Sequence, residues 1–389
     1  MEQSHRILHI VGDSKAGGGS AVISGIARMA LSRGWSVDYL TTNKRAQQWA
    51  RELGLGVVDL DVIWREIRPF KDLVGLVKLT AFLKKNNYSL IHTHTSKGGF
   101  VGRIAGRLAR VPSIVHTVHG FAFHECSGSV QTRVYASLEK IAAYACDRIV
   151  TVSHYHRQWA LRLRIAGPEK IVAVPNGIGQ SRVESSAAAL SVRRAWGCAD
   201  DDVVLLSHGR LAEQKGLAYL LEALAHLRAS EHRIRLFIAG EGPLEAALKA
   251  QAKTMGIGPM VTFLGYCNNI GTLLAAADVV VLPSLWEGLS ISLLEAMAAG
   301  KPVITTSIGS NLEVTDGGNA ALLVPPKDAG ALAAAIMKLA EEKDTRYDLA
   351  ERGRRIYLER YTEDRMMSGY RSIYESLLAS PVRASRRRA

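Results

Sequence analysis

Short runs of consecutive apolar residues alternate along this chain with longer segments in which apolar residues recur every three or four positions. The short runs have the pattern of strands buried on both faces, and the longer segments have that of amphipathic helices. Their regular alternation predicts a parallel α/β architecture. In the first half we predict strands near 6–11, 36–41, 56–60, 89–94, 113–118, 147–152 and 170–174, and helices near 20–33, 44–53, 71–86, 97–110, 129–145 and 154–166.

A second series of similar design follows the turn residues of 175–178. Two series of this kind predict two doubly wound, Rossmann-like domains. We predict strands of the second series near 203–208, 234–239, 260–264, 278–282, 302–305 and 321–323, and helices near 216–229, 243–255, 269–276, 290–299 and 328–342, with further helix over 345–380.

A chain of 389 residues is long enough for two domains. No apolar run reaches 18 residues, which argues against a transmembrane helix, and we expect no signal peptide before the first strand. We place an N-terminal Rossmann-like domain at 1–178, a linker region at 179–200, a C-terminal Rossmann-like domain at 201–361, a C-terminal helix at 362–380 and a basic tail at 381–389.

Positive charge is concentrated in the first half of the chain. Residues 1–180 contain 24 Lys and Arg against 12 Asp and Glu, whereas residues 181–389 contain 25 against 24. This asymmetry predicts an anionic partner for the N-terminal half. A membrane surface or a diphosphate-linked substrate fits better than nucleic acid, because no nucleic-acid-binding module is recognisable. The four cysteines lack C-x-x-C spacing, as in a reduced cytosolic protein without structural zinc.

Two glutamates, Glu287 and Glu295, stand eight positions apart near the end of the chain. Glu287 follows a predicted buried strand, and Glu295 lies about two turns into the helix after it. Ligands of open α/β sheets bind at the carboxyl ends of the strands, where this loop lies. Carboxylates there suit the hydroxyl groups of a sugar or a ribose. Gly288 allows close approach of the backbone to a ligand.

A glycine-rich loop, residues 17–20, follows the first strand and opens a helix. Glycines permit close backbone approach, and a helix N-terminus favours anions. The loop is not a dinucleotide fingerprint, because Val22 stands where G-x-G-x-x-G requires glycine, and it lacks the Lys-Ser/Thr of a P-loop.

Histidines gather at the ends of two predicted strands. His92 and His94 alternate on one strand, and His116 and His119 accompany the end of the next. Four histidines near two strand ends make a metal site one possible interpretation. Against it, no carboxylate accompanies these histidines in the sequence. The other interpretations are a hydrogen-bonded core histidine and a ligand-binding histidine loop.

Arg210 and Lys215 follow the first strand of the second half in the pattern G-R-x-x-x-x-K-G. Two cations at the carboxyl end of a strand suit a diphosphate. Two stretches, 59–61 and 200–202, contain the letters of a D-x-D metal motif, but we interpret both as solvated acids. Without a convincing D-x-D motif, the sequence favours a reaction that needs no metal. Arg210, Lys215 and helix dipoles would then stabilise a departing diphosphate.

These pieces occur in an order that resembles the retaining glycosyltransferases of family GT4. The resemblance rests on the E-x7-E pair, the G-R-x4-K-G loop, the glycine-rich loop and the H-T-x-H-G run that ends at Gly120. It implies a GT-B fold, in which two Rossmann-like domains face a cleft and the last helix crosses back to the N-terminal domain. It also implies that neither a cofactor nor a metal is needed.

The same resemblance implies roles for individual residues. His119 and Glu287 would be the catalytic pair that holds the donor sugar, and Glu295 would bind the ribose. The backbone N–H groups of 288–290 would help the two cations to stabilise the diphosphate. The residues assigned to nucleotide-sugar binding are Gly18, Gly19, Arg210, Lys215, Gly240, Tyr266, Gly288, Leu289, Ser290 and Glu295.

The histidine-rich stretches are similar to those of family members that build bacterial surface polysaccharides on lipid carriers. We therefore expect transfer from a UDP-sugar to a polyprenyl-diphosphate-linked saccharide, at the cytoplasmic face of the plasma membrane. The alternatives are a GDP-sugar donor, a UDP-GlcNAc 2-epimerase type of enzyme and an inactive sugar-nucleotide-binding subunit. The basic residues expected to face an anionic membrane or the acceptor diphosphate are Lys71, Lys78, Lys84, Lys85, Arg103, Arg107 and Arg110.

Overall fold

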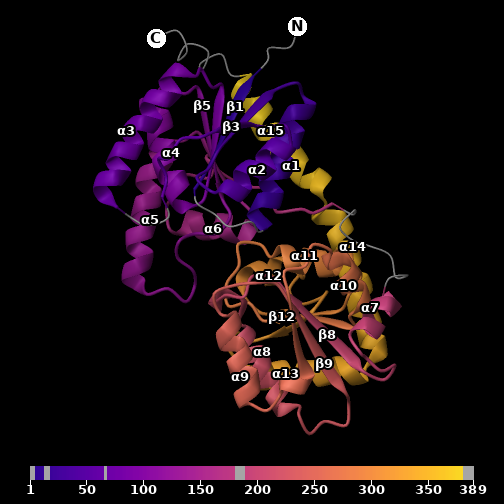
Figure 1. Ribbon diagram of the computed structural model, residues 1–389. Helices are drawn as coiled ribbons and strands as arrows, with labels where there is room; N and C mark the ends of the chain where they lie inside the picture. The colour runs from indigo at the N-terminus through magenta and orange to yellow at the C-terminus, as the bar shows by residue number, and fades with distance from the viewer. Residues whose placement is uncertain (1–4, 13–17, 65–67, 180–188, 380–389) are drawn as a thin grey trace. The chain divides into compact units, whose positions relative to one another are not determined.

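The computed structural model describes residues 5–12, 18–64, 68–179 and 189–379 (Figure 1). The chain divides into two compact units, one comprising 1–176 and 364–389 and the other comprising 177–363. Gly17, residues 180–188 of the predicted linker and residues 381–389 of the predicted basic tail lie outside the described residues. Within the described part of the chain, no helix is both long and apolar enough to span a bilayer.

The first unit is built around a seven-stranded parallel sheet with the order β3-β2-β1-β4-β5-β6-β7. Its strands are β1 (Arg6–Val11), β2 (Ser36–Leu40), β3 (Gly56–Val58), β4 (Leu90–His94), β5 (Ser113–Val118), β6 (Arg148–Thr151) and β7 (Ile171–Ala173). Its helices are α1 (Gly18–Ser32), α2 (Lys44–Glu52), α3 (Pro69–Lys85), α4 (Ser96–Leu108), α5 (Ser129–Tyr144), α6 (His154–Arg162) and α15 (Glu363–Leu378).

Helices cover both faces of this sheet. Buried side chains of α3, α4, α5 and α6 form one core with the strands, and those of α1, α2 and α15 form the other. Helix α15 comes from the end of the chain, yet its tyrosines Tyr370 and Tyr374 are fully buried in the first unit. They hydrogen-bond Thr117 and His92, on the sheet strands.

The second unit has a six-stranded parallel sheet with the order β10-β9-β8-β11-β12-β13. Its strands are β8 (Val203–His208), β9 (Ile234–Ala239), β10 (Val261–Gly265), β11 (Val279–Leu282), β12 (Val303–Thr306) and β13 (Leu322–Val324). Its helices are α7 (Ala189–Ala195), α8 (Leu217–His226), α9 (Glu245–Thr254), α10 (Ile270–Ala276), α11 (Ile291–Ala298), α12 (Gly309–Val314), α13 (Ala329–Glu341) and α14 (Lys343–Arg360), with 3₁₀ turns at Glu213–Lys215 and Gly258–Met260.

Both sheets reverse their strand order next to the first strand of the unit. The reversal lies between β1 and β4 in the first unit and between β8 and β11 in the second. The loops at the carboxyl ends of such a strand pair diverge to opposite faces, which leaves room for a ligand. The predicted α/β class and the strands of both series are confirmed to within about two residues.

The helical segment predicted over 345–380 is two helices, α14 and α15, because the chain leaves helical geometry at Tyr361 and Thr362, next to the boundary at which the separate C-terminal helix was placed. Ile178 donates its N–H to the Tyr361 carbonyl, 3.0 Å away, and pairs with Thr362 as an isolated bridge. Helix α12 was not predicted, because its six residues are too few to show helical periodicity.

The predicted exposure of Arg103 is wrong. Its side chain is fully buried between α4 and α5. The guanidinium donates from Nε to the Gly99 carbonyl and from Nη2 to the Glu139 carboxylate, each at 2.8 Å. Arg103 therefore stabilises the helix layer and is not part of a basic surface. A charge pattern could not reveal this, because the partner lies 36 positions away on another helix.

Candidate active site

Glu287 lies in the loop between β11 and α11, as the sequence predicts, and its carboxylate is almost fully buried. Three side chains donate hydrogen bonds to it. Lys215 Nζ lies 2.5 Å from Oε1, Ser284 Oγ 2.9 Å from Oε1 and Gln214 Nε2 2.9 Å from Oε2. A buried carboxylate requires such partners, because desolvation of an isolated charge is costly. The ion pair fixes the predicted sugar-binding acid beside the predicted diphosphate-binding lysine.

The loop that carries Lys215 packs directly against the loop that carries Glu287. Gly216 has a backbone φ of +61°, and a Cβ there would lie 2.1 Å from the carbonyl oxygen of Pro283. The Leu285 N–H also donates to the Gln214 carbonyl, 2.7 Å away. Only glycine allows this approach. Gly216, the second glycine of the G-R-x4-K-G pattern, therefore lets the two loops meet at the switch point between β8 and β11.

Glu295 lies in α11 and accepts a hydrogen bond from His208, with Nε2 and Oε2 3.1 Å apart. His208 is the last residue of β8, and its carbonyl accepts a second bond from Ser292 Oγ at 3.0 Å. Ser290 caps α11, because its hydroxyl accepts from the Leu293 N–H. These contacts hold the N-terminus of α11 against the end of β8, where its dipole would favour an anion.

The remaining predicted residues of this unit also follow strand ends. Arg210 follows β8 and is exposed, and Tyr266 follows β10 and is 69% exposed. Gly240 follows β9 with a φ of +133°, and a Cβ there would lie 1.9 Å from the Gly209 carbonyl oxygen. Gly240 is therefore required by backbone packing, whether or not it also borders a ligand. A small pocket at this edge is lined by Ser207, His208, Gly209, Arg210, Lys215 and Pro283, among others.

In the first unit, the predicted residues Gly19 and His119 lie side by side. Gly19 is in the first turn of α1, and a Cβ on it would be 3.7 Å from the His119 ring. His119 follows β5 and is partly exposed. The glycine therefore leaves one side of the imidazole uncovered by a side chain. Gly18 begins the same helix.

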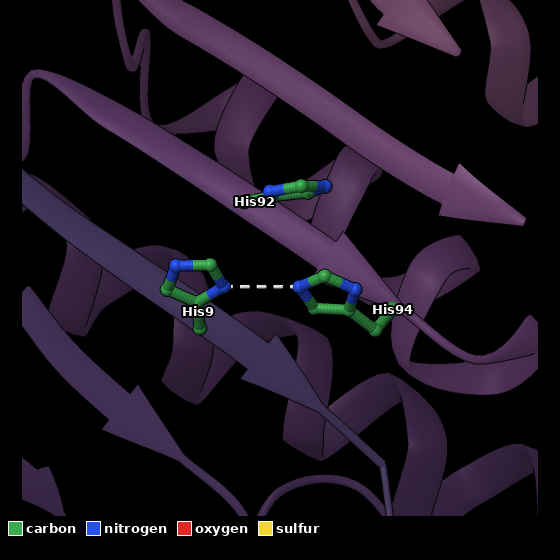
Figure 2. Close-up of side chains that lie close together, drawn as sticks. All are labelled: His9, His92 and His94. Atoms are coloured by element: carbon green, nitrogen blue, oxygen red, sulfur yellow. Dashed lines mark hydrogen bonds between the residues drawn. The ribbon is translucent and has the colours of Figure 1, made fainter. Parts of the chain in front are cut away.

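Behind His119 lies a buried group of histidines that the sequence indicated only in part. His9 of β1 stands opposite His92 of β4, and His94 is two residues further along β4 (Figure 2). His9 Nδ1 and His94 Nε2 are 3.0 Å apart, and His94 Nδ1 and His119 Nε2 are 3.1 Å apart. His9 was missed, although a single polar residue inside an otherwise apolar strand at the switch point was the available signal.

Burial holds these histidines neutral. It lowers the pKa of His119 to about 4 and that of His9 to about 3. The pKa values of His92, His94 and His116 also lie well below 6.5, chiefly through burial and further through neighbouring positive charge.

Three of these rings, His9, His92 and His94, are close enough to raise the metal interpretation again, with candidate ligand atoms within 4.8 Å of one another. Both nitrogens of His92 are already engaged, however, by Tyr374 Oη and Thr117 Oγ1 at 2.7 Å each. Both nitrogens of His94 are engaged as well. A cation would have to break these hydrogen bonds, and among the described residues no carboxylate belongs to the group to offset its charge.

Comparison with known proteins agrees with this geometry. The family model described as "Glycosyl transferase 4-like domain" matches residues 17–177, and that described as "Glycosyl transferases group 1" matches residues 190–356. The UDP-Gal:alpha-D-GlcNAc-diphosphoundecaprenol alpha-1,3-galactosyltransferase of Escherichia coli is 34% identical over 288 residues, which cover 72% of this chain and 73% of that protein. The D-inositol 3-phosphate glycosyltransferase of Saccharomonospora viridis is 30% identical over 402 residues, covering 95% of this chain and 91% of that one.

Solved structures share the fold. The crystal structure of Anabaena Alr3699/HepE in complex with UDP-glucose has a TM-score of 0.82 at 22% identity, and the match covers 95% of this chain and 99% of that one. Two parallel Rossmann-like units, both family models and full-length structural similarity lead to the same assignment. The chain belongs to the GT4-type glycosyltransferases, and its fold is GT-B.

Proposed function

We propose that this protein is a retaining, metal-independent transferase that moves a sugar from a UDP-sugar to a lipid-linked saccharide during bacterial surface polysaccharide synthesis. The observation that carries the proposal is the Lys215–Glu287 ion pair at the switch point of the second unit, where Arg210 lines the same small pocket as Lys215. The Escherichia coli relative supports both substrates, because its name specifies a UDP-sugar donor and a diphosphoundecaprenol-linked acceptor.

The reaction replaces one bond at the anomeric carbon of the donor sugar. The bond to the diphosphate oxygen breaks, a bond to the acceptor hydroxyl oxygen forms on the same face, and the hydroxyl proton passes to the departing phosphate. Arg210, Lys215 and the N-terminus of α11 offset the charge that develops on the diphosphate. In the unliganded chain the Lys215 charge is balanced by Glu287, so the lysine is already held in place before a diphosphate arrives.

Glu287 and His119 bind hydroxyls of the donor sugar in this proposal, and Glu295 binds the ribose. The Glu295 carboxylate is oriented by His208 and keeps a partly exposed side chain. The buried ion pair similarly limits the conformations open to Glu287. Orientation of this kind raises the rate because less entropy is lost when the donor binds.

We further propose that the first unit docks on an anionic membrane at the cytoplasmic side, through α3 and α5. Helix α3 exposes an apolar stripe, Phe70, Leu73, Val74 and Val77, of which Phe70 is 80% exposed. Exposed lysines flank it at 71, 78, 84 and 85. Helix α5 exposes a second stripe, which consists of Val130, Val134, Leu138, Ile141 and Tyr144. Apolar stripes flanked by basic residues are typical of helices that lie in a membrane interface.

Donor identity is tested by a thermal-shift series with UDP, GDP, ADP and their sugar conjugates, with and without Mg²⁺. A shift specific to uridine compounds and unchanged by Mg²⁺ supports the proposal. Lys215→Ala should abolish that shift, whereas Lys249→Ala, which removes an exposed lysine of the same unit, should leave it intact. A guanosine-specific shift, or turnover of UDP-GlcNAc without an acceptor, would contradict it.

Membrane docking is tested by sedimentation with vesicles of anionic and of neutral lipid. Lys78→Glu and Val77→Asp should each weaken binding to anionic vesicles, and added salt should weaken it further. Lys253→Glu makes the same charge change on α9 of the second unit and serves as the control. Equal binding to neutral vesicles, or equal effects of Lys78→Glu and Lys253→Glu, would count against the proposal.

A further inference from the structure

Three histidines of the first unit form one hydrogen-bonded line that ends at the candidate sugar-binding site. His9 Nδ1 is 3.0 Å from His94 Nε2, which is the contact drawn in Figure 2. His94 Nδ1 is in turn 3.1 Å from His119 Nε2. The line begins in the fully buried interior of the sheet and ends at a ring that is partly exposed.

The hydrogen bonds along this line must all run in one direction. A neutral imidazole carries one N–H donor and one acceptor nitrogen, and His94 uses both. If His94 accepts from His9, it must donate to His119. If it instead accepts from His119, it must donate to His9. The tautomer of His9 therefore sets which ring nitrogen of His119 carries the proton.

His9 favours the first direction. Its Nε2 is buried and has no hydrogen-bond partner among the described residues. A buried N–H without a partner is rarer than a buried acceptor without one. The proton of His9 thus belongs on Nδ1, where it is donated to His94. His94 then donates from Nδ1 to Nε2 of His119, and His119 keeps its own proton on Nδ1.

We propose that His9 and His94 are positioning residues that hold His119 as the Nδ1–H tautomer and so present a hydrogen-bond donor to a hydroxyl oxygen of the donor sugar. The role in sugar binding rests on the proposed function, whereas the tautomer follows from the hydrogen bonds alone. Among the described residues, no protein group hydrogen-bonds His119 Nδ1. The adjacent Gly19 leaves that side of the ring without a covering side chain.

The neighbouring histidines do not interrupt this line. His92 lies 4.2 Å from His94 between ring centres, but its nitrogens bond Tyr374 and Thr117. His116 bonds Thr93 on the other side of the strand. Since burial also keeps the pKa of each ring low, the line remains a chain of neutral donors and acceptors at neutral pH.

The tautomer is measured by two-bond ¹H–¹⁵N correlation spectra of the full chain labelled with ¹⁵N-histidine. These spectra distinguish a protonated ring nitrogen from a bare one. His119 should show a protonated Nδ1 and a bare Nε2. His94→Leu, which removes the donor to Nε2 of His119, should mix the two tautomers of His119, because the partly exposed ring then has no fixed partner. His94→Asn places an amide N–H near the position of Nδ1 and should restore the single tautomer. His9 should itself show a protonated Nδ1 and a bare Nε2.

His116→Asn is the matched control, because it alters a buried histidine of the same sheet that is outside the line. It should leave the His119 tautomer unchanged. Kinetically, His94→Leu should lower kcat/KM for the donor roughly fivefold, as expected for one hydrogen bond, and His94→Asn should recover most of it. A His119 or a His9 with a protonated Nε2, or an unchanged His119 tautomer in folded His94→Leu, would overturn the proposal.

The tautomer measurement also separates this proposal from the proposed function. If the spectra show the Nδ1–H form and its loss in His94→Leu, but no sugar nucleotide binds, the positioning stands and the proposed function fails. Stoichiometric Zn²⁺ that is retained by the purified protein and lost in His9→Leu would overturn the neutral line, since a metal would then occupy the same nitrogens.

Discussion

Replacement of Lys215 by methionine tests whether the buried ion pair holds the second unit together. The Lys215 and Glu287 side chains are 17% and 7% exposed, and the lysine ammonium is 2.5 Å from the carboxylate. Methionine keeps most of the apolar stem and removes the charge. Glu287 then remains buried with two neutral donors, Gln214 and Ser284.

The expected loss of stability depends on the hydrogen bonds that Glu287 keeps when Lys215 is replaced. Removal of one partner of a buried pair typically costs about 3–5 kcal/mol, because the other charge is left uncompensated. Two of the three donors to the carboxylate remain, so we expect a loss of about 2 kcal/mol in the free energy of unfolding. For a unit of this size, that corresponds to a fall in Tm of about 4–8 °C. Glu287→Gln combined with Lys215→Met should recover about 1–2 kcal/mol of the summed single losses, because neither charge remains.

Calorimetry and urea denaturation of the two single variants and the double variant give this coupling energy. Lys249→Met removes an exposed lysine that pairs with Glu245 within one helix, and we expect it to cost about 0.3–0.5 kcal/mol. If the losses of the two single variants simply add, to within about 0.5 kcal/mol, then Lys215 and Glu287 are not coupled and the argument fails.

Three further predictions concern stability. Gly240→Ala should cost at least about 2 kcal/mol, because a Cβ there meets the Gly209 carbonyl at a positive φ; an unchanged urea midpoint would contradict this. Arg103→Met should cost about 2–3 kcal/mol by calorimetry, because Glu139 loses its partner, and should leave vesicle binding intact. The free energy of unfolding should fall as the pH drops from 6.5 toward about 4, because His119 takes up a proton in the unfolded chain but stays neutral in the folded one. Each histidine of this kind should lower the free energy of unfolding by up to about 1.4 kcal/mol per pH unit, and a Tm that is flat from pH 7 to pH 5 would refute this.

The order of elements and the placement of the candidate site residues after strand ends could be predicted from the sequence, because both depend on local patterns. Buried parallel strands read as continuous apolar runs, and a ligand loop must follow a strand end. Glu287 and Lys215 were therefore identified separately, each from its own loop. The loops at Arg210, Gly240 and Tyr266 also follow neighbouring strands of one sheet.

The partners of these residues could not be predicted, because they come from distant parts of the chain. Lys215 and Glu287 are 72 positions apart, and His92 and Tyr374 are 282 apart. Local periodicity carries no information about which strand lies beside which. The same limit explains the error at Arg103, whose position in a basic segment concealed a buried contact with Glu139.

Both sheets reverse their strand order beside the first strand, but the side chains next to that reversal differ in chemistry. In the first unit, the strands beside it carry histidines that burial keeps neutral, and a neutral ring can bond a hydroxyl without a counterion. In the second, the loops beside it carry permanent cations, which suit a diphosphate. A sugar nucleotide contains both chemistries. A charge introduced at His94 should therefore weaken the first unit more than it helps binding, because no acidic group among the described residues lies in that cluster to balance it.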